Sequence, residues 1–421
     1  MGEGGTTGSL TVLVLVVGGN VGIRGTVPAR LPDTAGVHGR LYCHDPLRQR
    51  PCCVRTSYYP SLDGLRAFAV MLVLCGHAGL PFIVSGGVGV DIFFVLSGFL
   101  ITSILSEEIE QRGRLRLANF YIRRILRLFP ALCVTIALFC IVTLVEERRF
   151  PTTVALVAIT HTANWARAMF DVPMASLQHF WSLASEEQYY LVWPLIVVAL
   201  ERYIPGYANK ALTLLILAAA LAGYRYCMVD TFEVERIYFA LDTHMDGLVL
   251  GSALSYFLRA PGTADMLMRN GRMLAWLLVP TAIVALIVLM HAMSWRDPAM
   301  GKYGFLLAAA AAAVIICDLV AGPRSLLRSL LSLAPVVYVG RISYGLYLLH
   351  LLVFHIADRL LPSTAHAIVV PVKFAASIAA ASLSYYGYEQ RFLKLKTKFR
   401  SDTPADGSVP VRAINAPQSL P

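Results

Sequence analysis

The chain has 421 residues, of which 57% are hydrophobic and 15% charged, and its mean hydropathy is +0.63. A soluble protein of this length needs more polar residues to cover its surface, so the composition excludes an ordinary soluble globular protein. The net charge of +10 does not indicate nucleic-acid binding, because Lys and Arg concentrate in the short segments between apolar blocks.

The first 56 residues differ in composition from the rest of the chain. They are rich in Gly, Pro and Arg and contain one apolar run, 10–17, which is too short to cross a bilayer. The residues before this run include Glu3 and no Lys or Arg, whereas a secretory signal has a basic start. We therefore predict a disordered extension over 1–56, a transmembrane domain over 57–392, and a basic, largely disordered cytoplasmic tail over 393–421.

The eight cysteines do not predict a disulfide framework or a metal site. Five of them sit in apolar blocks, where a thiol behaves as a small hydrophobic side chain. The remaining group, Cys43, His44, Cys52 and Cys53, matches no standard zinc spacing. We expect no bound metal and no resident cofactor.

Ten apolar blocks of about twenty residues have the length that crosses a hydrocarbon core as a helix. They lie at 64–83, 86–106, 131–146, 184–201, 210–228, 243–259, 273–293, 303–321, 336–357 and 366–388. An apolar stretch near 152–163 is too short to span. With ten spans, the basic segments all fall on one side, which the positive-inside rule makes cytoplasmic. The sequence thus predicts an all-α, polytopic bundle of about ten transmembrane helices in the cytoplasmic membrane, with both termini cytoplasmic.

The first predicted span carries Arg66 and His77, which are eleven positions apart. That spacing is almost three helical turns, so both side chains face the same way, about 16 Å apart along the axis. Ionisable residues inside a membrane helix are costly and suggest function. The alternative is an arginine that reaches the interface and a histidine bonded to a neighbouring helix. For the pair on one face, we favour a functional role.

The second predicted span carries Asp91 at its outer end and the pair Ser97-Gly98 midway. A small-residue pair inside a membrane helix usually marks close packing, which is the interpretation we keep for Gly98. Asp91 either caps the start of the helix or belongs to a site.

A basic segment follows at 119–132, where Arg123, Arg124 and Arg127 recur at helical spacing beside aromatic residues. Such an amphipathic basic helix commonly binds anionic lipid headgroups. The alternative is a clamp for the phosphates of a nucleotide-bearing donor, since the guanidinium fork matches phosphate oxygens. Composition alone favours the lipid interpretation.

The segment HFWSLASEEQYYLVWP, residues 179–194, begins the fourth predicted span. Ser182, Glu186 and Tyr190 are spaced by four and share one face. Glu186 is placed to orient a sugar hydroxyl or to polarise His77, and Trp181 and Tyr190 are candidates for a stacking wall. Interfacial Trp and Tyr are also ordinary residues of the membrane belt.

Two later segments carry further polar groups. Asp242 and Asp246 share a face at the outer end of the sixth predicted span, with His244 between them, but metal binding by this trio is weakly supported. Three polar side chains lie on one face of the ninth span: Ser343, Tyr347 and His350. For these three we expect an interior hydrogen-bond cluster.

The motifs together resemble the membrane-bound acyltransferase 3 family. They are, in order, LDGLRAFAVMLVLCGH, GVDIFFVLSGFLI, the Arg-Arg-x-x-Arg run ending at Phe129-Pro130, FWSLASEEQYYLVWP and ISYGLYLLH. The resemblance covers roughly 57–392. It implies about ten membrane helices, an acyl-CoA donor and acylation of carbohydrate hydroxyls. It also implies that Arg66 and His77 are the essential pair, that Arg124 and Arg127 lie near the donor, and that Glu186 is the motif's carboxylate. The fused hydrolase-like domain of some members is expected to be absent.

The residue patterns and the family resemblance lead to one mechanistic hypothesis. An acyl-CoA, expected to be acetyl-CoA, binds its phosphates at Arg66, Arg124 and Arg127. His77 acts as general base on the acceptor hydroxyl, tuned by a carboxylate such as Glu186 or Asp91. An acyl-histidine intermediate is a second route left open. The residues expected to support or bind the acceptor, a cell-surface or lipid-linked glycan, are Asp91, Ser97, Trp181, Ser182, Tyr190, Asp242 and Asp246.

Two other classes of protein were weighed against an acyltransferase. A secondary transporter of a small polar solute or anion predicts inverted repeats and paired broken helices, which the sequence does not display. A membrane scaffold without enzymatic activity gives no reason for the Arg66–His77 pair.

Overall fold

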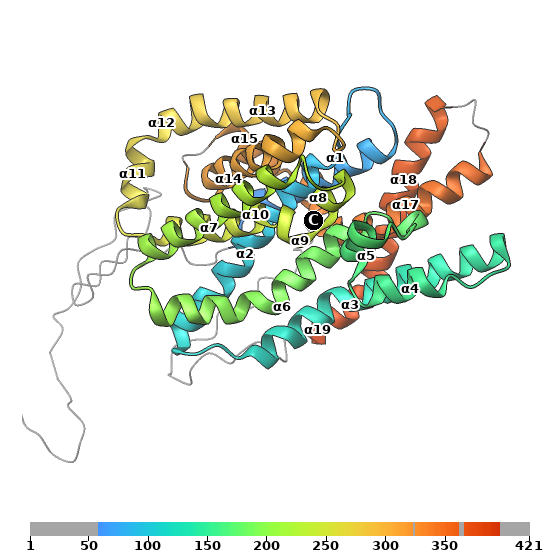
Figure 1. The fold of residues 1–421 in the computed structure, drawn as a ribbon, viewed down its shortest axis with the longest axis horizontal. Coiled ribbons are helices and arrows are strands. Elements are labelled where there is room, and N and C mark those ends of the chain that lie inside the picture. The colour runs from blue at the N-terminus through green and yellow to red at the C-terminus, as the bar shows by residue number, and fades with distance from the viewer. Residues whose placement is uncertain (1–57, 323–324, 362–365, 396–421) are drawn as a thin grey trace, which may run out of the picture. The chain divides into compact units, whose positions relative to one another are not determined.

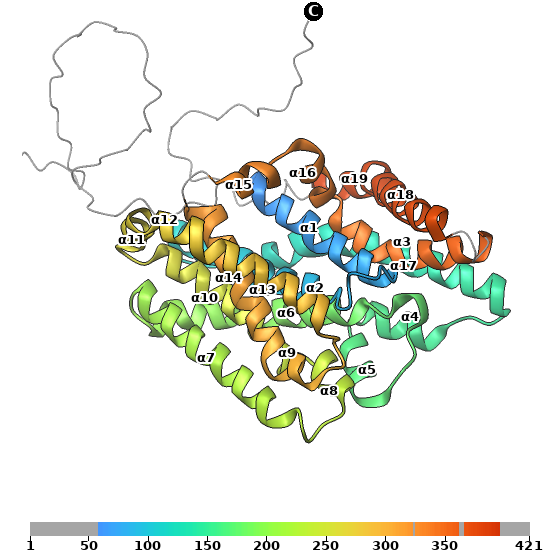
Figure 2. The ribbon, with the colours of Figure 1, turned by 90° about the horizontal axis from the view of Figure 1, so that it is seen from above.

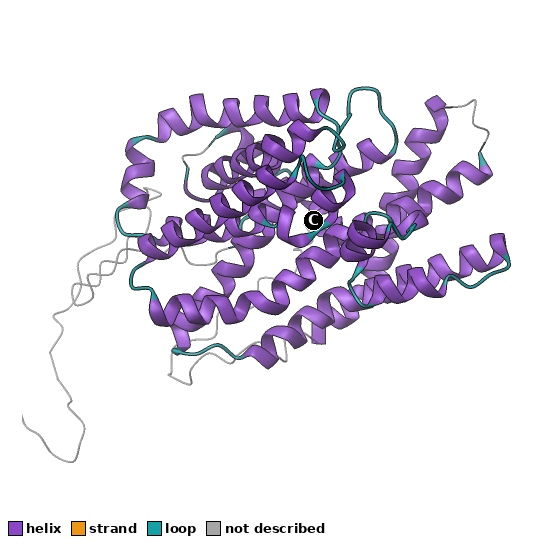
Figure 3. Ribbon diagram, in the orientation of Figure 1, coloured by secondary structure: helices purple, strands orange, loops and turns teal. Residues whose placement is uncertain are grey.

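The computed structural model describes residues 58–322, 325–361 and 366–395. Within these ranges the chain forms helices joined by loops, and no strand occurs in them (Figure 3). The prediction of an all-α protein is therefore confirmed for the described part of the chain. The predicted extension over 1–56 and the tail beyond Leu395 lie outside the described residues.

Among the described residues, six helices are long and apolar enough to cross a membrane (Figure 1). They are α2 (Val88–Arg112), α3 (Leu117–Glu147), α7 (Tyr207–Met228), and the continuous helices Gly271–Ala292, Met300–Ala321 and Ala367–Leu395. A seventh candidate is the pair α16 (Ala334–Arg341) and α17 (Ser343–Leu360), which is bent by 71° at the break between them. The chain is thus a multi-pass helical membrane protein.

The other three predicted spans fall on α1 (Pro60–His77), α6 (Phe180–Tyr203) and α10 (Asp246–Arg259). None of these three helices combines the length and the apolar composition that the six helices have. Their polar side chains are largely covered by neighbouring helices, because all three pack against α2. Polar side chains on membrane helices are expected to face the interior of a bundle in this way.

One predicted boundary changes in the structure. The basic segment 119–132 and the span 131–146 were expected as separate elements, but both belong to the continuous 31-residue helix α3, with Pro130 inside it. The arginines therefore lie on the same rigid helix as the apolar span, and not on a separate surface helix. The stretch 152–163 contains only α4 (Thr152–Ile159) before α5 (Ala163–Phe170) begins, in agreement with the prediction that it is too short to span.

The closest helix pair is α2 and α10, which lie side by side in Figures 1 and 2. A Cβ atom at Gly98 would stand 1.9 Å from the Leu248 carbonyl oxygen, and one at Gly251 would stand 2.0 Å from the Val95 carbonyl oxygen. Only glycine fits at both positions, so the prediction that Gly98 marks close packing is confirmed. A hydrogen bond from the Thr102 hydroxyl to the Ser252 hydroxyl, 2.7 Å long, joins side chains of the two helices.

Shorter elements close the ends of the bundle. They are η1 (Ala175–Leu177), α8 (Val234–Phe239), α9 (Leu241–His244), α11 (Thr263–Arg269) and α15 (Leu326–Leu331). Of these, α8 packs against α5, and η1 packs against α17. The helices α1, α2, α3, α6 and α17, with these short elements, position the site described next.

Candidate functional site

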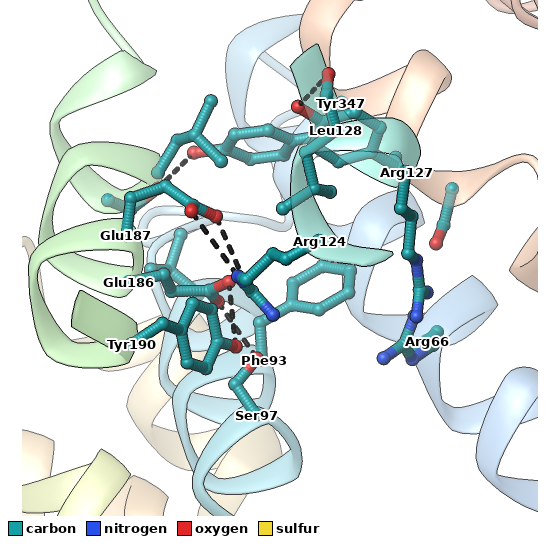
Figure 4. Close-up of a pocket in the computed structure, with 15 residues that line it drawn as sticks. Arg66, Phe93, Ser97, Arg124, Arg127, Leu128, Glu186, Glu187, Tyr190 and Tyr347 are labelled. Atoms are coloured by element: carbon teal, nitrogen blue, oxygen red, sulfur yellow. Dashed lines mark hydrogen bonds and ion pairs between the residues drawn. The ribbon is translucent and has the colours of Figure 1, made fainter. Parts of the chain in front are cut away.

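A cavity lies among α1, α2, α3, α6 and α17, and we call it the arginine cavity (Figure 4). Seven of the twelve site residues predicted from the sequence line it: Arg66, Ser97, Arg124, Arg127, Ser182, Glu186 and Tyr190. The shared face predicted for Ser182, Glu186 and Tyr190 is the face of α6 that borders this cavity. Helical periodicity was sufficient to group residues on one helix, and packing brings the five helices together.

Arg124 already has a counter-ion in this cavity. Its Nε donates to Glu187 Oε2 at 3.3 Å, and one terminal nitrogen donates to Glu187 Oε1 at 3.0 Å. Its guanidinium also lies over the Tyr190 ring, 3.2 Å from the ring centre. This combination of a two-pronged ion pair and an aromatic face holds Arg124 in one orientation.

Arg66 and Arg127 point toward one another on the other side of the same cavity (Figure 4). Neither forms an ion pair or hydrogen bond with another residue that the structure describes. Two neighbouring cations that form no direct ion pair repel each other, so an anion between them is favoured. The unpaired cations of the cavity are thus Arg66 and Arg127, whereas the sequence singled out Arg124 and Arg127 as the pair near the donor.

Glu186 is held by two hydroxyl groups and does not reach His77. Ser97 Oγ donates to Glu186 Oε1 at 3.1 Å, and the Tyr190 hydroxyl donates to Oε2 at 3.3 Å. The expectation that Glu186 tunes His77 is therefore not supported by its contacts. The predicted catalytic group of Arg66, Glu186 and His77 is divided, with the first two lining the arginine cavity and His77 lying elsewhere.

His77 ends α1 and is hydrogen-bonded to a second histidine. The distance between His77 Nδ1 and His350 Nε2 is 3.0 Å, and His350 Nδ1 lies 2.7 Å from the Tyr347 carbonyl oxygen. A carbonyl only accepts, so the proton of neutral His350 is on Nδ1 and its Nε2 is an acceptor. His77 Nδ1 must then be the donor, which leaves the lone pair of His77 on Nε2. The partner of His77 is thus a histidine and neither of the two carboxylates proposed from the sequence.

His77 lines a second cavity, which we call the histidine cavity. Its other polar or aromatic lining residues are Arg167, Gln178, His179, Trp181, Tyr238, Phe239, Trp295 and Tyr347. Of these, only Trp181 was among the predicted site residues. His179 is 2% exposed, and its ring packs against that of Tyr347, with the ring centres 5.0 Å apart.

The two cavities adjoin each other along the same helices. Val90 and Tyr347 line both of them. The Tyr347 hydroxyl lies 2.5 Å from Ser182 Oγ and donates to the His179 carbonyl at 2.8 Å, and the cluster predicted for Ser343, Tyr347 and His350 stays a prediction. On α1, Arg66 belongs to one cavity and His77 to the other, about 16 Å apart along the helix.

Asp91, Asp242 and Asp246 line neither cavity. Asp91 is buried and bonded to His244 Nε2 at 2.9 Å. Asp246 forms a buried bidentate pair with Arg225, at 2.6 and 2.9 Å, and Asp242 pairs with Arg236 at 2.8 and 2.6 Å.

These contacts join α2 to α9, α7 to α10 and α8 to α9, and the supporting role predicted for the three aspartates stays a prediction. Among the described residues, no group of three His, Cys, Asp or Glu side chains is arranged to hold a metal ion.

His350 and His179 were not among the site residues predicted from the sequence, although each lies in or directly beside one of the family motifs. His350 ends the ISYGLYLLH segment, and His179 immediately precedes FWSLASEEQYYLVWP. The pattern places His350 on a polar face, but it does not show that this face meets α1 near His77. That contact joins residues 273 positions apart.

The fold and the two cavities define a multi-pass membrane protein with a histidine and unpaired arginines inside its helical bundle. Residues 59–386 match the acyltransferase domain that characterises the acyltransferase 3 family. The chain therefore belongs to the acyltransferase 3 family, as its motifs predicted, and this is a family of acyltransferases.

Named relatives support the same assignment. The chain is 30% identical over 306 residues to the peptidoglycan O-acetyltransferase OatA of Listeria monocytogenes. The aligned region covers 70% of this chain and 49% of that protein. It is 32% identical over 304 residues to the O-acetyltransferase OatA of Staphylococcus aureus, covering 70% of this chain and 50% of that protein. The chain thus spans about half the length of these relatives. No solved structure matches it.

Proposed function

We propose that this protein is a membrane O-acetyltransferase that moves an acetyl group from acetyl-CoA to a hydroxyl of a cell-envelope polysaccharide. The observation that carries the proposal is the His77–His350 pair, which leaves a base at His77 Nε2 in a cavity adjoining the unpaired arginines. The family and the peptidoglycan O-acetyltransferases among its relatives support the reaction type and the class of acceptor.

The proposal includes a topology with ten spans and both termini in the cytoplasm. It adds α1, α6 and α10 to the six apolar helices and the bent pair. In the cytoplasmic membrane, this orientation puts the basic segments inside. Arg66, near the start of α1, then lies toward the cytoplasm, and His77, at its end, lies toward the exterior. A donor from inside and an acceptor from outside would meet between them.

For the donor, we assign Arg66 and Arg127 to the phosphates of acetyl-CoA. Both are cations without a partner among the described residues, and phosphate is an anion that arginine binds well. Arg124 is committed to Glu187 and Tyr190, so it positions the donor with its remaining terminal nitrogen. The pantetheine arm would extend past Tyr347, which borders both cavities, toward His77.

The reaction follows from the tautomer of His77. Nε2 accepts the proton of the acceptor hydroxyl while the hydroxyl oxygen attacks the thioester carbonyl carbon. The new C–O bond forms and the C–S bond breaks, with its electron pair leaving on the CoA sulfur. The sulfur takes the proton from His77 Nε2, so the products are an O-acetyl ester and free CoA thiol, and His77 returns to its neutral form.

The test uses the full chain purified in lipid nanodiscs, with isotope-labelled acetyl-CoA and glycan strands from peptidoglycan. We expect labelled O-acetyl esters on the glycan and an equal amount of free CoA thiol, measured by mass spectrometry and thiol titration. Absence of transfer from acetyl-CoA, together with uptake of a polar solute into proteoliposomes, would replace this proposal with the transporter alternative. No observed contact favours that alternative at present.

A further inference from the structure

We infer that Asp91 and His244 form a positioning pair that holds Trp181 and Tyr238 in place on the wall of the histidine cavity. The inference rests on the proposed function, because His77 is expected to meet the acceptor hydroxyl in that cavity. Neither member of the pair lines the cavity, so each acts through the rings in front of it. The carboxyl group of the motif GVDIFFVLSGFLI thereby gains a defined role in the reaction.

His244 packs against aromatic rings from separate helices. Its ring is stacked on Phe305 of α14 (Phe305–Ala321), with the ring centres 3.9 Å apart and an angle of 18° between the planes. It is also stacked with Trp181 of α6, at 5.5 Å and 21°. Its Nδ1 lies 2.8 Å from the carbonyl oxygen of Tyr238 on α8. The orientation of His244 therefore fixes a ring on α6 and the backbone of α8.

Trp181 and Tyr238 extend this order to the cavity. Both rings border it, and their centres are 4.8 Å apart. A Cβ atom at Gly87 would stand 2.3 Å from the Tyr238 hydroxyl, so the backbone of Gly87, which also borders the cavity, lies directly against that hydroxyl. A shift of His244 would consequently move two of the rings of the cavity relative to His77.

Asp91 holds the second ring nitrogen of His244. Asp91 Oδ1 lies 2.9 Å from His244 Nε2, and each of the two residues is 3% exposed. Arg225 and Asp246 are the other charged groups near Asp91, and they neutralise each other in their bidentate pair. A carboxyl group inside a membrane bundle is costly and suggests a function. Here its contact is the ring that orients the cavity wall.

The contacts of His244 also set the number of protons that the pair holds. The Tyr238 carbonyl only accepts, so Nδ1 carries a proton and donates it. A carboxylate and an unprotonated Nε2 both only accept, so the contact with Asp91 needs a second proton between them. The pair is then an imidazolium beside a carboxylate or an imidazole beside a carboxylic acid. In both forms its net charge is zero, and no uncompensated charge lies behind the cavity.

The test uses the full chain in nanodiscs and two binding measurements that require no transfer. Isothermal titration calorimetry gives the affinity for CoA and, separately, for glycan strands from peptidoglycan. Asp91→Ala and His244→Phe should each weaken glycan binding about tenfold, because a hydrogen bond that orients the wall is lost. The affinity for CoA should stay unchanged, since neither residue lines the arginine cavity. An equal loss for both ligands would show a role in folding alone and would overturn the inference.

Asp91→Asn separates the hydrogen bond from the charge. Asn keeps the shape of Asp91, and its amide group donates to Nε2 of a neutral His244 as a carboxylic acid does. We expect its glycan affinity to stay within about twofold of wild type. A loss as large as that of Asp91→Ala would refute the positioning role. The matched controls are Asp230→Asn and His291→Phe, which should change neither affinity, because both residues are exposed and line neither cavity.

The protons on His244 are observed by NMR of its ring nitrogens in isotope-labelled protein, with His244→Phe used to assign the signals. A protonated Nδ1 is expected whether the second proton lies on Nε2 or on Asp91. A neutral ring protonated at Nε2 alone would overturn the inference, because the Tyr238 carbonyl would then be unbound. If the variants change glycan binding as expected but wild-type protein transfers no acetyl group, the proposed function fails while this inference stands.

Discussion

His77 Nδ1 lies 3.0 Å from His350 Nε2, so the side chain that pairs with the proposed base is another histidine. His350 is fully buried and its own Nδ1 is held by the Tyr347 carbonyl. A neutral partner fixes the tautomer of His77 without adding a charge to the interior of the bundle. In a membrane protein this is less costly than a buried carboxylate, whose desolvation is large.

His77 is the residue whose substitution should affect chemistry most. As the general base it should contribute about 10²- to 10⁴-fold to turnover. His77→Ala and His77→Gln should both lose that factor in kcat while the protein still inserts and purifies normally. Gln keeps hydrogen-bonding capacity but accepts no proton at neutral pH. Near-native turnover in His77→Gln would mean that His77 is a structural hydrogen-bond partner, and the mechanism would fail.

His350 is a positioning residue, and its substitution should lower kcat without changing either KM. His350→Leu removes the acceptor for His77 Nδ1–H, which frees the ring to change tautomer. The loss of one hydrogen bond predicts roughly a tenfold decrease in kcat. His350→Gln retains an acceptor oxygen and should recover part of the rate. A loss of thermal stability in both variants with equal effects on kcat would point to packing alone.

Arg66 and Arg127 should govern the affinity for the donor. Arg127→Gln should raise the KM for acetyl-CoA about tenfold, because a charge-assisted contact to phosphate is worth roughly 1.5–3 kcal/mol. Acetyl-pantetheine, which lacks the nucleotide phosphates, should show no such difference between variant and wild type. Changing Arg124 and Arg127 together to Gln should raise the KM for acetyl-CoA further.

The control for this prediction is Arg123→Gln on the same helix. Arg123 pairs with Glu108 and does not line the arginine cavity. The alternative is that Arg123, Arg124 and Arg127 bind lipid headgroups. In that case substitution of any of them should reduce membrane insertion and leave the KM for acetyl-CoA unchanged.

The α2–α10 contact should not tolerate a side chain at Gly98. Gly98→Ala puts a methyl group into the Leu248 carbonyl, so the helices must separate. Overpacking of this kind costs about 1–3 kcal/mol or more, and we expect a lower Tm and poor yield. Gly223→Ala is the control, because nothing lies within 4 Å of a Cβ built there. Similar melting of the two variants would contradict the packing described for Gly98.

Topology is tested by cysteine labelling in a background without the eight native cysteines. Arg116 and Lys396 are predicted to face the cytoplasm, and Glu233 and Asp297 the exterior. Lys396 lies outside the described residues, so its assignment depends on the basic segments alone. A membrane-impermeant maleimide should therefore label only the Cys variants of Glu233 and Asp297 in intact cells. Labelling of Lys396→Cys from outside would refute the ten-span topology.

The sequence alone determined the helical class, the placement of the apolar segments and the family. Twenty-residue apolar blocks require helices, because no other open structure satisfies backbone hydrogen bonds in lipid. Periodicity within one helix also grouped Ser182, Glu186 and Tyr190 correctly, since 3.6 residues per turn fixes which side chains share a face. It identified Arg66 and His77, but not the separate cavities to which they belong.

Only the tertiary structure decided which groups are partners. His77 meets His350 across 273 residues, and Arg124 meets Glu187 across 63. Each outcome depends on how two helices are rotated and how closely they approach. That rotation is set by packing at contacts such as Gly98 against Leu248, and the period of a single helix carries no information about it.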